Sequence, residues 1–141
     1  MMLERDAAAN RELVRRIFED GINGANDAVL HELLAPGYVN HDLPGTRPGP
    51  EGFAMVVSVF RTGFPDLVIY VEEVIAAGAM VSTRGYFSGT HRGEFMGVQP
   101  SDESILVKYI DQWRIEDGLA AESWVSIDLL GLMQQIGAIG S

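Results

Sequence analysis

The sequence predicts an α+β fold, with helices in the first half of the chain and an antiparallel sheet in the second. Up to Pro65 the apolar residues recur at helical spacing, and from Asp66 onward they alternate with polar residues as in strands. Helices followed by a run of strands are typical of a sheet packed on helices. The chain has 141 residues and an ordinary globular composition, 47% hydrophobic and 21% charged. We therefore expect a single domain over residues 1–141.

Three helices are predicted before the sheet. The first, at residues 3–20, carries one apolar stripe at helical period, with charged residues on its other side. The second, at residues 27–35, can begin at an N-cap formed by Asn26 or Asp27. Residues 51–64 form the third. The helices thus supply apolar faces that can pack on a sheet.

Two β-hairpins and a short closing helix are predicted after the helices, because alternation and turn residues recur there. The segment 36–50, which lies between the second and third helices, holds four of the six prolines and predicts a loop or a bent extended segment. The strands are expected at residues 66–78, 79–91, 103–118 and 119–128, and the closing helix at residues 129–137.

The turn "IEDGL" of the second hairpin allows two registers. A two-residue loop of Asp117 and Gly118 pairs Glu116 with Leu119, whereas a three-residue loop with Gly118 in a G1 bulge pairs Ile115 with Leu119. One residue of slip moves every side chain to the other face of the sheet. We favour the three-residue loop, because it groups the polar side chains of the hairpin on one face.

The favoured register places Gln112 opposite Glu122 and Ile110 opposite Trp124, and makes Arg114 a diagonal neighbour of Glu122. One face then carries Gln112, Arg114, Glu122, Trp124, Ser126 and Asp128. The other carries Tyr109, Asp111, Trp113, Val125 and Ile127, a mixture suited to a second sheet or a subunit contact. If the helices cover the first face, Asp128 points into a half-apolar enclosure of the kind in which a carboxylate acts as a general base.

The composition excludes several classes of function. A net charge of −10 with only ten scattered Lys and Arg residues argues against a nucleic-acid partner. No apolar run approaches the roughly 20 residues that span a bilayer, and the charged N-terminus is unlike a signal peptide. The chain has no cysteine, which excludes disulfides and a thiolate nucleophile, and it has no "GxSxG" motif of a serine hydrolase. We expect a cytoplasmic protein with no membrane partner.

Several local strings occur in an order that points to a family: "YVNHD", "GPEGF", "FPDL", "GTHRGEFMGV", "RIEDGLAAESW", and an aspartate four residues after that tryptophan. Together with the predicted layout, they closely resemble the SnoaL-like polyketide cyclases, or ester cyclases, of the nuclear transport factor 2-like superfamily. The resemblance covers roughly residues 10–137. It implies a cone-shaped α+β barrel, with N-terminal helices packed on a curved antiparallel or mixed sheet around one pocket. It also implies a homodimer or homotetramer.

The resemblance implies an enzyme without metal or cofactor that closes a polyketide ring by intramolecular aldol condensation. Such chemistry needs a placed base, donors for the developing oxyanion and a cavity that holds a hydrophobic carbonyl substrate folded. By motif position, Asp128 matches the family's general acid/base. The expected substrate-binding residues are Asn40 with its neighbour His41, His91 of the "GTH" loop, Gln112, Arg114 at a position where such a cyclase can have histidine, and Trp124 in the pocket wall.

Alternatives to this interpretation remain open at the sequence level. Asp128 directly precedes a predicted helix and can act as its N-cap. His41 and Asp42 invite a metal interpretation, but no second ligand motif supports one. The runner-up function is a non-catalytic protein of the same fold that binds a hydrophobic small molecule, because one scaffold hosts many functions. Epoxide hydrolysis would need a set of polar pocket residues that the sequence does not reveal.

Overall fold

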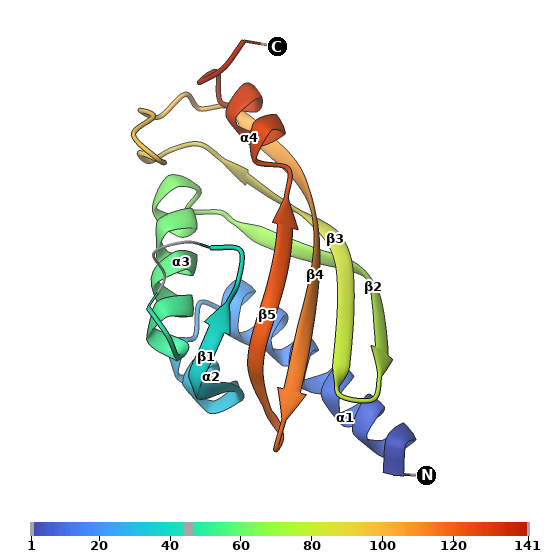
Figure 1. Cartoon of the computed structure of the whole chain (residues 1–141). Helices are drawn as coiled ribbons and strands as arrows, with labels where there is room; N and C mark the ends of the chain where they lie inside the picture. Colours follow the sequence, from blue (N-terminus) through green and yellow to red (C-terminus); the bar gives the residue numbers. More distant parts are fainter. Residues whose placement is uncertain (1, 44–46, 141) are drawn as a thin grey trace.

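The computed structural model describes residues 2–43 and 47–140. The helices are α1 (Met2–Arg16), continued directly by the π-helix η1 (Ile17–Asn23), then α2 (Asp27–Leu33), α3 (Pro50–Gly63) and α4 (Leu129–Gln135) (Figure 1). The strands are β1 (Leu34–Asn40), β2 (Val68–Ala77), β3 (Met80–Thr90), β4 (Ser104–Glu116) and β5 (Leu119–Ile127). The α+β prediction is confirmed.

The five strands form one curved mixed sheet in the order β1-β5-β4-β3-β2. β2 to β5 are antiparallel neighbours, whereas β1 runs parallel to β5. β1 covers the first part of the proline-rich segment, which therefore adopts the bent extended form, one of the two predicted there. Leu34 and Ala35, which were predicted at the end of the second helix, belong to β1 instead. The sheet is open, with β1 and β2 at its edges, so the fold is the expected cone without a closed barrel.

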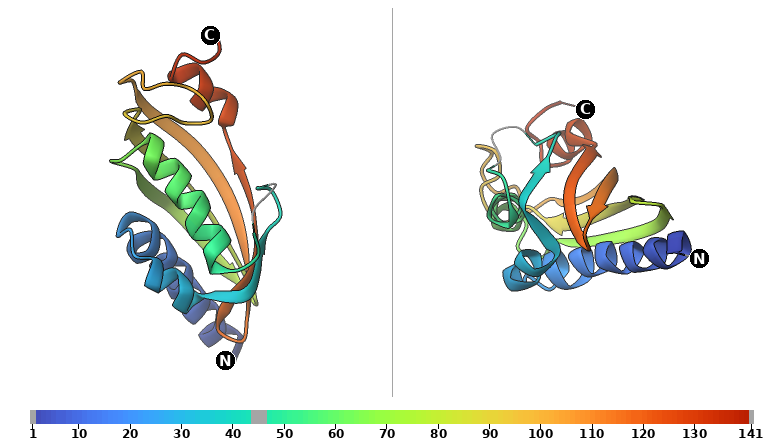
Figure 2. Two further views of the ribbon diagram at one scale, coloured as in Figure 1. Left: turned by 90° about the vertical axis from the view of Figure 1, so that its left-hand side faces the viewer. Right: turned by 60° about the horizontal axis from the view of Figure 1, so that its bottom comes forward.

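The helices α1, α2 and α3 lie on one side of the sheet, and α4 lies at the end of the sheet far from the N-terminus (Figure 2). The predicted stripe of the first helix is buried, with Val14, Ile17 and Phe18 all within the core. The helix is longer than predicted because η1 extends it to Asn23, whose side-chain amide donates to the Ile69 carbonyl and accepts from the Ile69 N–H. These two bonds fix the end of η1 against the edge strand β2.

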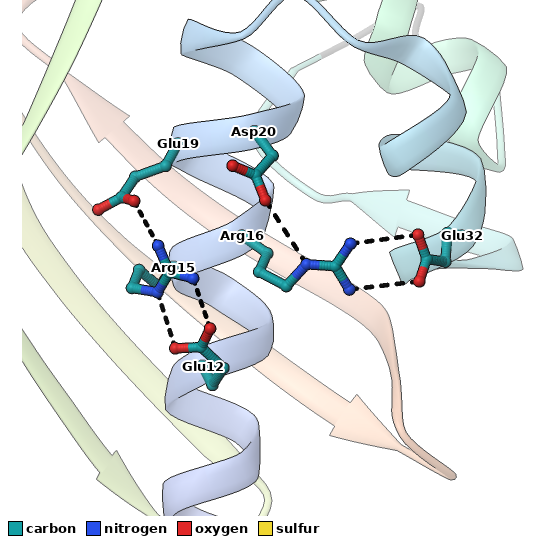
Figure 3. Close-up of polar contacts among 6 residues, drawn as sticks. All are labelled: Glu12, Arg15, Arg16, Glu19, Asp20 and Glu32. Carbon is teal, nitrogen blue, oxygen red and sulfur yellow. Dashed lines mark hydrogen bonds and ion pairs between the residues drawn. The ribbon is translucent and has the colours of Figure 1, made fainter.

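Ion pairs connect the outer sides of α1 and α2. Arg16 reaches Glu32 of α2 through two hydrogen bonds of 3.2 Å and lies 3.6 Å from Asp20 of η1 (Figure 3). Arg15 binds Glu12 and Glu19 on the same helical face. Because these pairs are solvent-exposed, each contributes little to stability, and the buried apolar stripe carries most of the packing.

The register of the second hairpin differs from the favoured prediction. The turn is the two-residue loop, with Asp117 and Gly118 both at positive φ and Glu116 paired with Leu119. A bulge then leaves Ala121 without a partner, so that Arg114 lies directly opposite Glu122. The prediction of the loop and of the pairs was therefore wrong. The grouping of polar side chains on one face was correct, because the bulge restores the phase that the shorter loop removes.

The helices do not cover the sheet face that was predicted to carry Asp128. They cover the opposite face. In β4 the odd-numbered residues from Ile105 to Ile115 are buried, and the even-numbered residues are exposed or half-buried. The face assigned to a second sheet or a subunit contact is therefore the inner face, packed on α1, η1 and α3. The face that carries Gln112 and Trp124 is the outer one.

Candidate active site

A cavity lies between the helices and the inner face of the sheet. Its apolar wall comes from Phe18, Ile22, Phe53 and Phe60 of the helices and from strand residues that include Phe87. The space in which the centre of a water molecule can lie has a volume of about 100 Å³. By the same measure, a site for a single water needs only about 10–15 Å³. A mostly apolar ligand of small organic size therefore fits it.

The polar part of the wall comes mainly from β4, β5 and the end of β1. Asp111 and Trp113 of β4, Ser123 of β5 and Asn40 of β1 all line the cavity. Successive odd-numbered residues of β4 point to the same face because side chains alternate along a strand. The sequence thus places a carboxyl group inside a mostly apolar enclosure.

Asp111 is 94% buried, and its carboxyl group has polar neighbours. The Thr83 hydroxyl donates to Asp111 Oδ1 at 2.5 Å. Burial raises the pKa of Asp111 to about 7, mainly because desolvation penalises the charged form, while hydrogen bonding from Thr83 and the Trp113 side chain acts in the opposite direction. Asp111 is therefore populated in both protonation states near neutral pH, as a general acid/base requires.

Tyr109 extends this contact into a chain of hydroxyls. Its phenolic oxygen lies 3.2 Å from Thr83 Oγ1. Thr83 has one hydroxyl proton, so at any moment it donates either to Tyr109 or to Asp111. Burial raises the pKa of Tyr109 to about 12, so the phenol stays protonated near neutral pH. Tyr109, Thr83 and Asp111 therefore form one chain of polar groups on the inner face.

A second buried hydroxyl pair joins β1 to β5. The Tyr38 hydroxyl lies 2.5 Å from Ser123 Oγ, and both side chains are about 1% exposed. Burial raises the pKa of Tyr38 to about 12, with Ser123 and Asn40 acting in the opposite direction through hydrogen bonds. The pair positions Ser123 and Asn40 at the cavity wall. Asn40 also accepts a hydrogen bond from the Asp42 N–H, which fixes its side chain.

Asp128, the residue expected from the sequence to be the general acid/base, lies outside the cavity. It is the N-cap of α4, and its Oδ1 accepts from the Gly131 N–H at 2.9 Å. Its side chain is exposed. The capping alternative describes this geometry, because the face that carries Asp128 is not the one covered by the helices.

Four of the expected substrate-binding residues also lie away from the cavity wall. His41 stacks on Trp124 with ring centroids 5.0 Å apart, and its Nε2 lies 2.8 Å from Glu122 Oε2. Glu122 in turn accepts from Arg114 Nε at 2.6 Å, which holds the pKa of the Glu122 carboxyl below its usual value, with His41 assisting. Gln112 is exposed between Arg114 and Ile110. These residues form a polar cluster on the outer face of the sheet.

His91 is fully buried, but it does not line the cavity. Its Nδ1 accepts from the Ser101 N–H at 3.1 Å and lies 2.9 Å from Ser101 Oγ, and its ring packs on Phe64. His91 therefore joins the two ends of the loop between β3 and β4. Of the seven expected site residues, Asn40 alone is in the cavity wall.

The sequence also contains a signal for Asp111, which was not among the expected site residues. In "ILVKYIDQW" the alternate residues Ile105, Val107, Tyr109 and Trp113 are large and apolar, and Asp111 is the single carboxylate in the same phase. A charged residue in the apolar phase of a strand is a candidate for a buried functional group. Its significance depends on which face the helices cover.

Two further properties concern the described residues. No helix among them is both long and apolar enough to cross a membrane. No group of three or more His, Cys, Asp or Glu residues in the same part of the chain is arranged to hold a metal ion.

Comparison with known proteins connects this fold to one family. Residues 12–136 match the family model of the SnoaL-like polyketide cyclases. TsrD from Streptomyces laurentii is 30% identical with a TM-score of 0.86, over 94% of this chain and 97% of that one. IdmH from Streptomyces antibioticus, described as a candidate polyketide cyclase, is 30% identical with a TM-score of 0.79, over 91% and 98% of the two chains. A SnoaL-like protein from Jannaschia sp. CCS1 is 29% identical with a TM-score of 0.84, over 94% of each chain. A search of curated proteins found no match.

Proposed function

Because the chain belongs to the SnoaL-like polyketide cyclase family, we propose that it is a cofactor-independent acid/base enzyme with Asp111 as the proton-transfer residue. The proposed reaction is an intramolecular aldol condensation, or a related proton transfer, on a hydrophobic carbonyl substrate. The observation that carries the proposal is the Asp111 carboxyl group, which lines an apolar cavity and has a pKa of about 7. It replaces Asp128 as the candidate.

One carboxyl group can carry out both proton transfers of the reaction. Ionised Asp111 takes a proton from the carbon between two carbonyl groups, and the electron pair of that C–H bond moves into the enolate. The enolate carbon attacks a second carbonyl carbon of the same molecule, a C–C bond forms, and that carbonyl becomes an alkoxide. Asp111 then returns its proton to the alkoxide, which leaves the enzyme as it began. A cavity with mostly apolar walls also holds the substrate folded, which favours attack within the same molecule.

The cavity suits this chemistry for a second reason. Phe18, Phe53, Phe60 and Phe87 supply a wall that an extended, charged molecule would contact poorly, whereas an apolar carbonyl compound buries its surface there. Aromatic walls also hold a flat conjugated chain in a small number of orientations. Holding the two reacting groups in the right orientation lowers the barrier to ring closure.

The test compares the Asp→Asn variants of the two candidate residues, Asp111 and Asp128. The probe is methyl benzoylacetate, a neutral aromatic β-keto ester whose α-protons exchange with D₂O, followed by proton NMR with and without protein. General acid/base catalysis contributes roughly 10²–10⁴-fold. We expect D111N to lose the protein-dependent exchange by about 10²-fold or more, and D128N to retain it.

The opposite result, loss in D128N and retention in D111N, would restore the sequence-based candidate. If the wild-type protein binds the probe but does not accelerate exchange, the acid/base function is wrong. The chain is then better described by the runner-up, a non-catalytic binding protein for hydrophobic small molecules.

We also propose that the chain assembles as a homodimer or homotetramer through the outer face of its sheet. Leu106 and Ile110 of β4 are about 60% exposed there, beside the half-buried Trp124. Large apolar side chains in the middle of a sheet face favour cover by a second sheet.

A further inference from the structure

Asp111 is connected to Tyr109, a second residue of the cavity wall, through the Thr83 hydroxyl. Thr83 Oγ1 lies 2.5 Å from Asp111 Oδ1 and 3.2 Å from the phenolic oxygen of Tyr109. All three side chains are buried on the inner face of the sheet, and both Asp111 and Tyr109 line the cavity. The reaction proposed above uses the carboxyl group alone, so the two hydroxyl groups are still without a role.

The protonation state of Asp111 decides how the protons of this chain can be arranged. An ionised carboxylate only accepts hydrogen bonds, whereas each hydroxyl group has one proton to donate. While Asp111 is ionised, its bond with Thr83 therefore uses the Thr83 proton, and the remaining contact is left for Tyr109 to donate. Once Asp111 is protonated, it can donate to Thr83, and the Thr83 proton can then turn to Tyr109.

The second arrangement releases the phenolic proton of Tyr109. A hydroxyl oxygen that accepts from Thr83 directs its own proton to another acceptor. Among the residues that the structure describes, Thr83 is the one hydrogen-bond partner of the Tyr109 hydroxyl. Because Tyr109 belongs to the cavity wall, the acceptor left for it is an oxygen atom of the bound molecule. The proton that Asp111 takes up thus reappears as a donor at Tyr109.

We propose that Tyr109 is the general acid of the ring closure, and that the Thr83 hydroxyl carries the proton of Asp111 to it. This proton relay, formed by Asp111, Thr83 and Tyr109, rests on the proposed acid/base function of Asp111. Tyr109 binds the carbonyl oxygen that becomes the alkoxide, whereas Asp111 acts on the carbon that becomes the enolate. The base and the acid are then two residues that act on two different atoms of the substrate.

The proton relay conserves protons and electron pairs. Asp111 removes a proton from the carbon between two carbonyl groups, and the enolate carbon forms a bond with the second carbonyl carbon. The π electrons of that carbonyl move to its oxygen, which takes the phenolic proton of Tyr109. Tyr109 takes the Thr83 proton, and Thr83 takes the proton of Asp111. The balance is the same as for direct return from Asp111, but a different atom delivers the proton.

The phenol suits the acid step because it stays protonated until the alkoxide forms. Burial raises the pKa of Tyr109 to about 12, and the pKa of Asp111 is about 7. An alkoxide is more basic than a phenolate, and a phenolate is more basic than a carboxylate. The proton therefore moves in one direction along the chain. A donor that is already in place also stabilises the alkoxide as its charge develops.

A single substrate can report both proton transfers. In methyl 3,7-dioxooctanoate, the C2 protons lie between a ketone and an ester, and they exchange with D₂O once a base removes them. The C2 enolate can also attack the C7 ketone and close a six-membered ring. Proton NMR follows the C2 signal and the C8 methyl signal in the same sample, so the ratio of ring closure to C2 exchange is measured directly.

We expect Y109F to lower this ratio by about 10²-fold, because general acid catalysis contributes roughly 10²–10⁴-fold. Without the phenolic proton the alkoxide reverts to the enolate, which then picks up deuterium. D111N should lose C2 exchange and, with it, ring closure. The matched control Y86F removes a phenolic hydroxyl from the outer face, where Tyr86 stacks on Tyr70, and should keep the wild-type ratio.

An unchanged ratio in Y109F, or C2 exchange by the wild-type protein without any ring closure, would overturn the proton relay. If D111N loses C2 exchange in either case, the acid/base function of Asp111 stands and the relay alone fails. If D111N keeps C2 exchange, the acid/base function fails and the relay fails with it. The two failures are therefore distinguishable.

Variants of Thr83 test whether the proton passes through its hydroxyl group. We expect the ratio to fall in T83V by about the same factor as in Y109F and to be restored in T83S, which keeps a hydroxyl group. A packing defect would instead slow exchange and ring closure together and leave the ratio unchanged. The double variant T83V/Y109F should lose no more than either single variant, because residues of one network are not additive. Losses that multiply would show that the two hydroxyl groups act independently, which contradicts the relay.

Discussion

The raised pKa of Asp111 predicts that ionisation of this carboxyl group opposes folding. Its pKa is about 7 in the folded protein, against an ordinary value of 3.8 that represents the unfolded chain. The folded state therefore binds the proton more tightly, and the stability due to protonated Asp111 is fully present below the unfolded pKa. It is lost as the pH rises between the two values. A difference of about three pKa units, at 1.36 kcal/mol each, corresponds to about 4 kcal/mol.

The D111N variant isolates this effect because asparagine is nearly the same size and does not ionise. We expect the free energy of unfolding of the wild-type protein, relative to D111N, to fall by about 3 kcal/mol between about pH 5 and pH 8. The remainder of the change lies below that range. Because both proteins share every other titrating group, the difference removes their contribution.

The assay is urea unfolding at a series of pH values, at one fixed protein concentration so that assembly does not alter the comparison. A difference that stays constant with pH would show that Asp111 ionises equally easily in the folded and unfolded chain. A difference that grows in favour of the wild type as the pH rises would show a lowered pKa. Either result would refute the acid/base assignment.

Two further predictions concern the Thr83 hydroxyl and the outer face of the sheet. The T83V variant lacks the hydroxyl that favours ionised Asp111. The pKa of Asp111 should therefore rise further, and the pH–rate profile of probe exchange should move to higher pH. The control variant S82A, changed on the outer face, should leave the profile in place. In I110K a charge enters the exposed apolar centre of the outer face, so light scattering should show a smaller assembly than for the wild type. The control M55K changes an exposed residue of α3 instead, and equal assembly of both variants would exclude the sheet face as the interface.

The element order was predictable from the sequence because periodicity is a local property. The first helix, the hairpins and the α4 segment follow from spacing alone. The edge strand β1 was left open as a loop or an extended segment, since its pairing with β5 depends on contacts about 80 residues away. The register of the second hairpin required two facts at once, the short turn and the bulge at Ala121, and either alone predicts the wrong face.

The residues of the cavity wall were harder to predict because both faces of the sheet carry aromatic residues. Trp113 and Trp124 alternate with similar polar neighbours, and the sequence does not state which face the helices cover. A cavity on the Trp124 face would have been lined by Gln112, Arg114 and Asp128. The helices instead cover the Trp113 face, so the cavity is lined by Asp111. The family resemblance supported the fold, and it implied the role of Asp128 by motif position alone, so that role stays a prediction beside the observed N-cap.

The pKa of Asp111 is a consequence of which groups the wall contains. Burial alone drives the carboxyl towards its neutral form, and a Lys or Arg in the wall would drive it back to a permanently ionised one. This cavity instead supplies the Thr83 hydroxyl and the Trp113 side chain, which offset part of the desolvation without adding charge. The balance leaves a carboxyl group that can take a proton and return it near neutral pH. Because no Lys, Arg or His is among the described residues of the wall, no neighbouring cation among them holds the carboxyl group permanently in its ionised form.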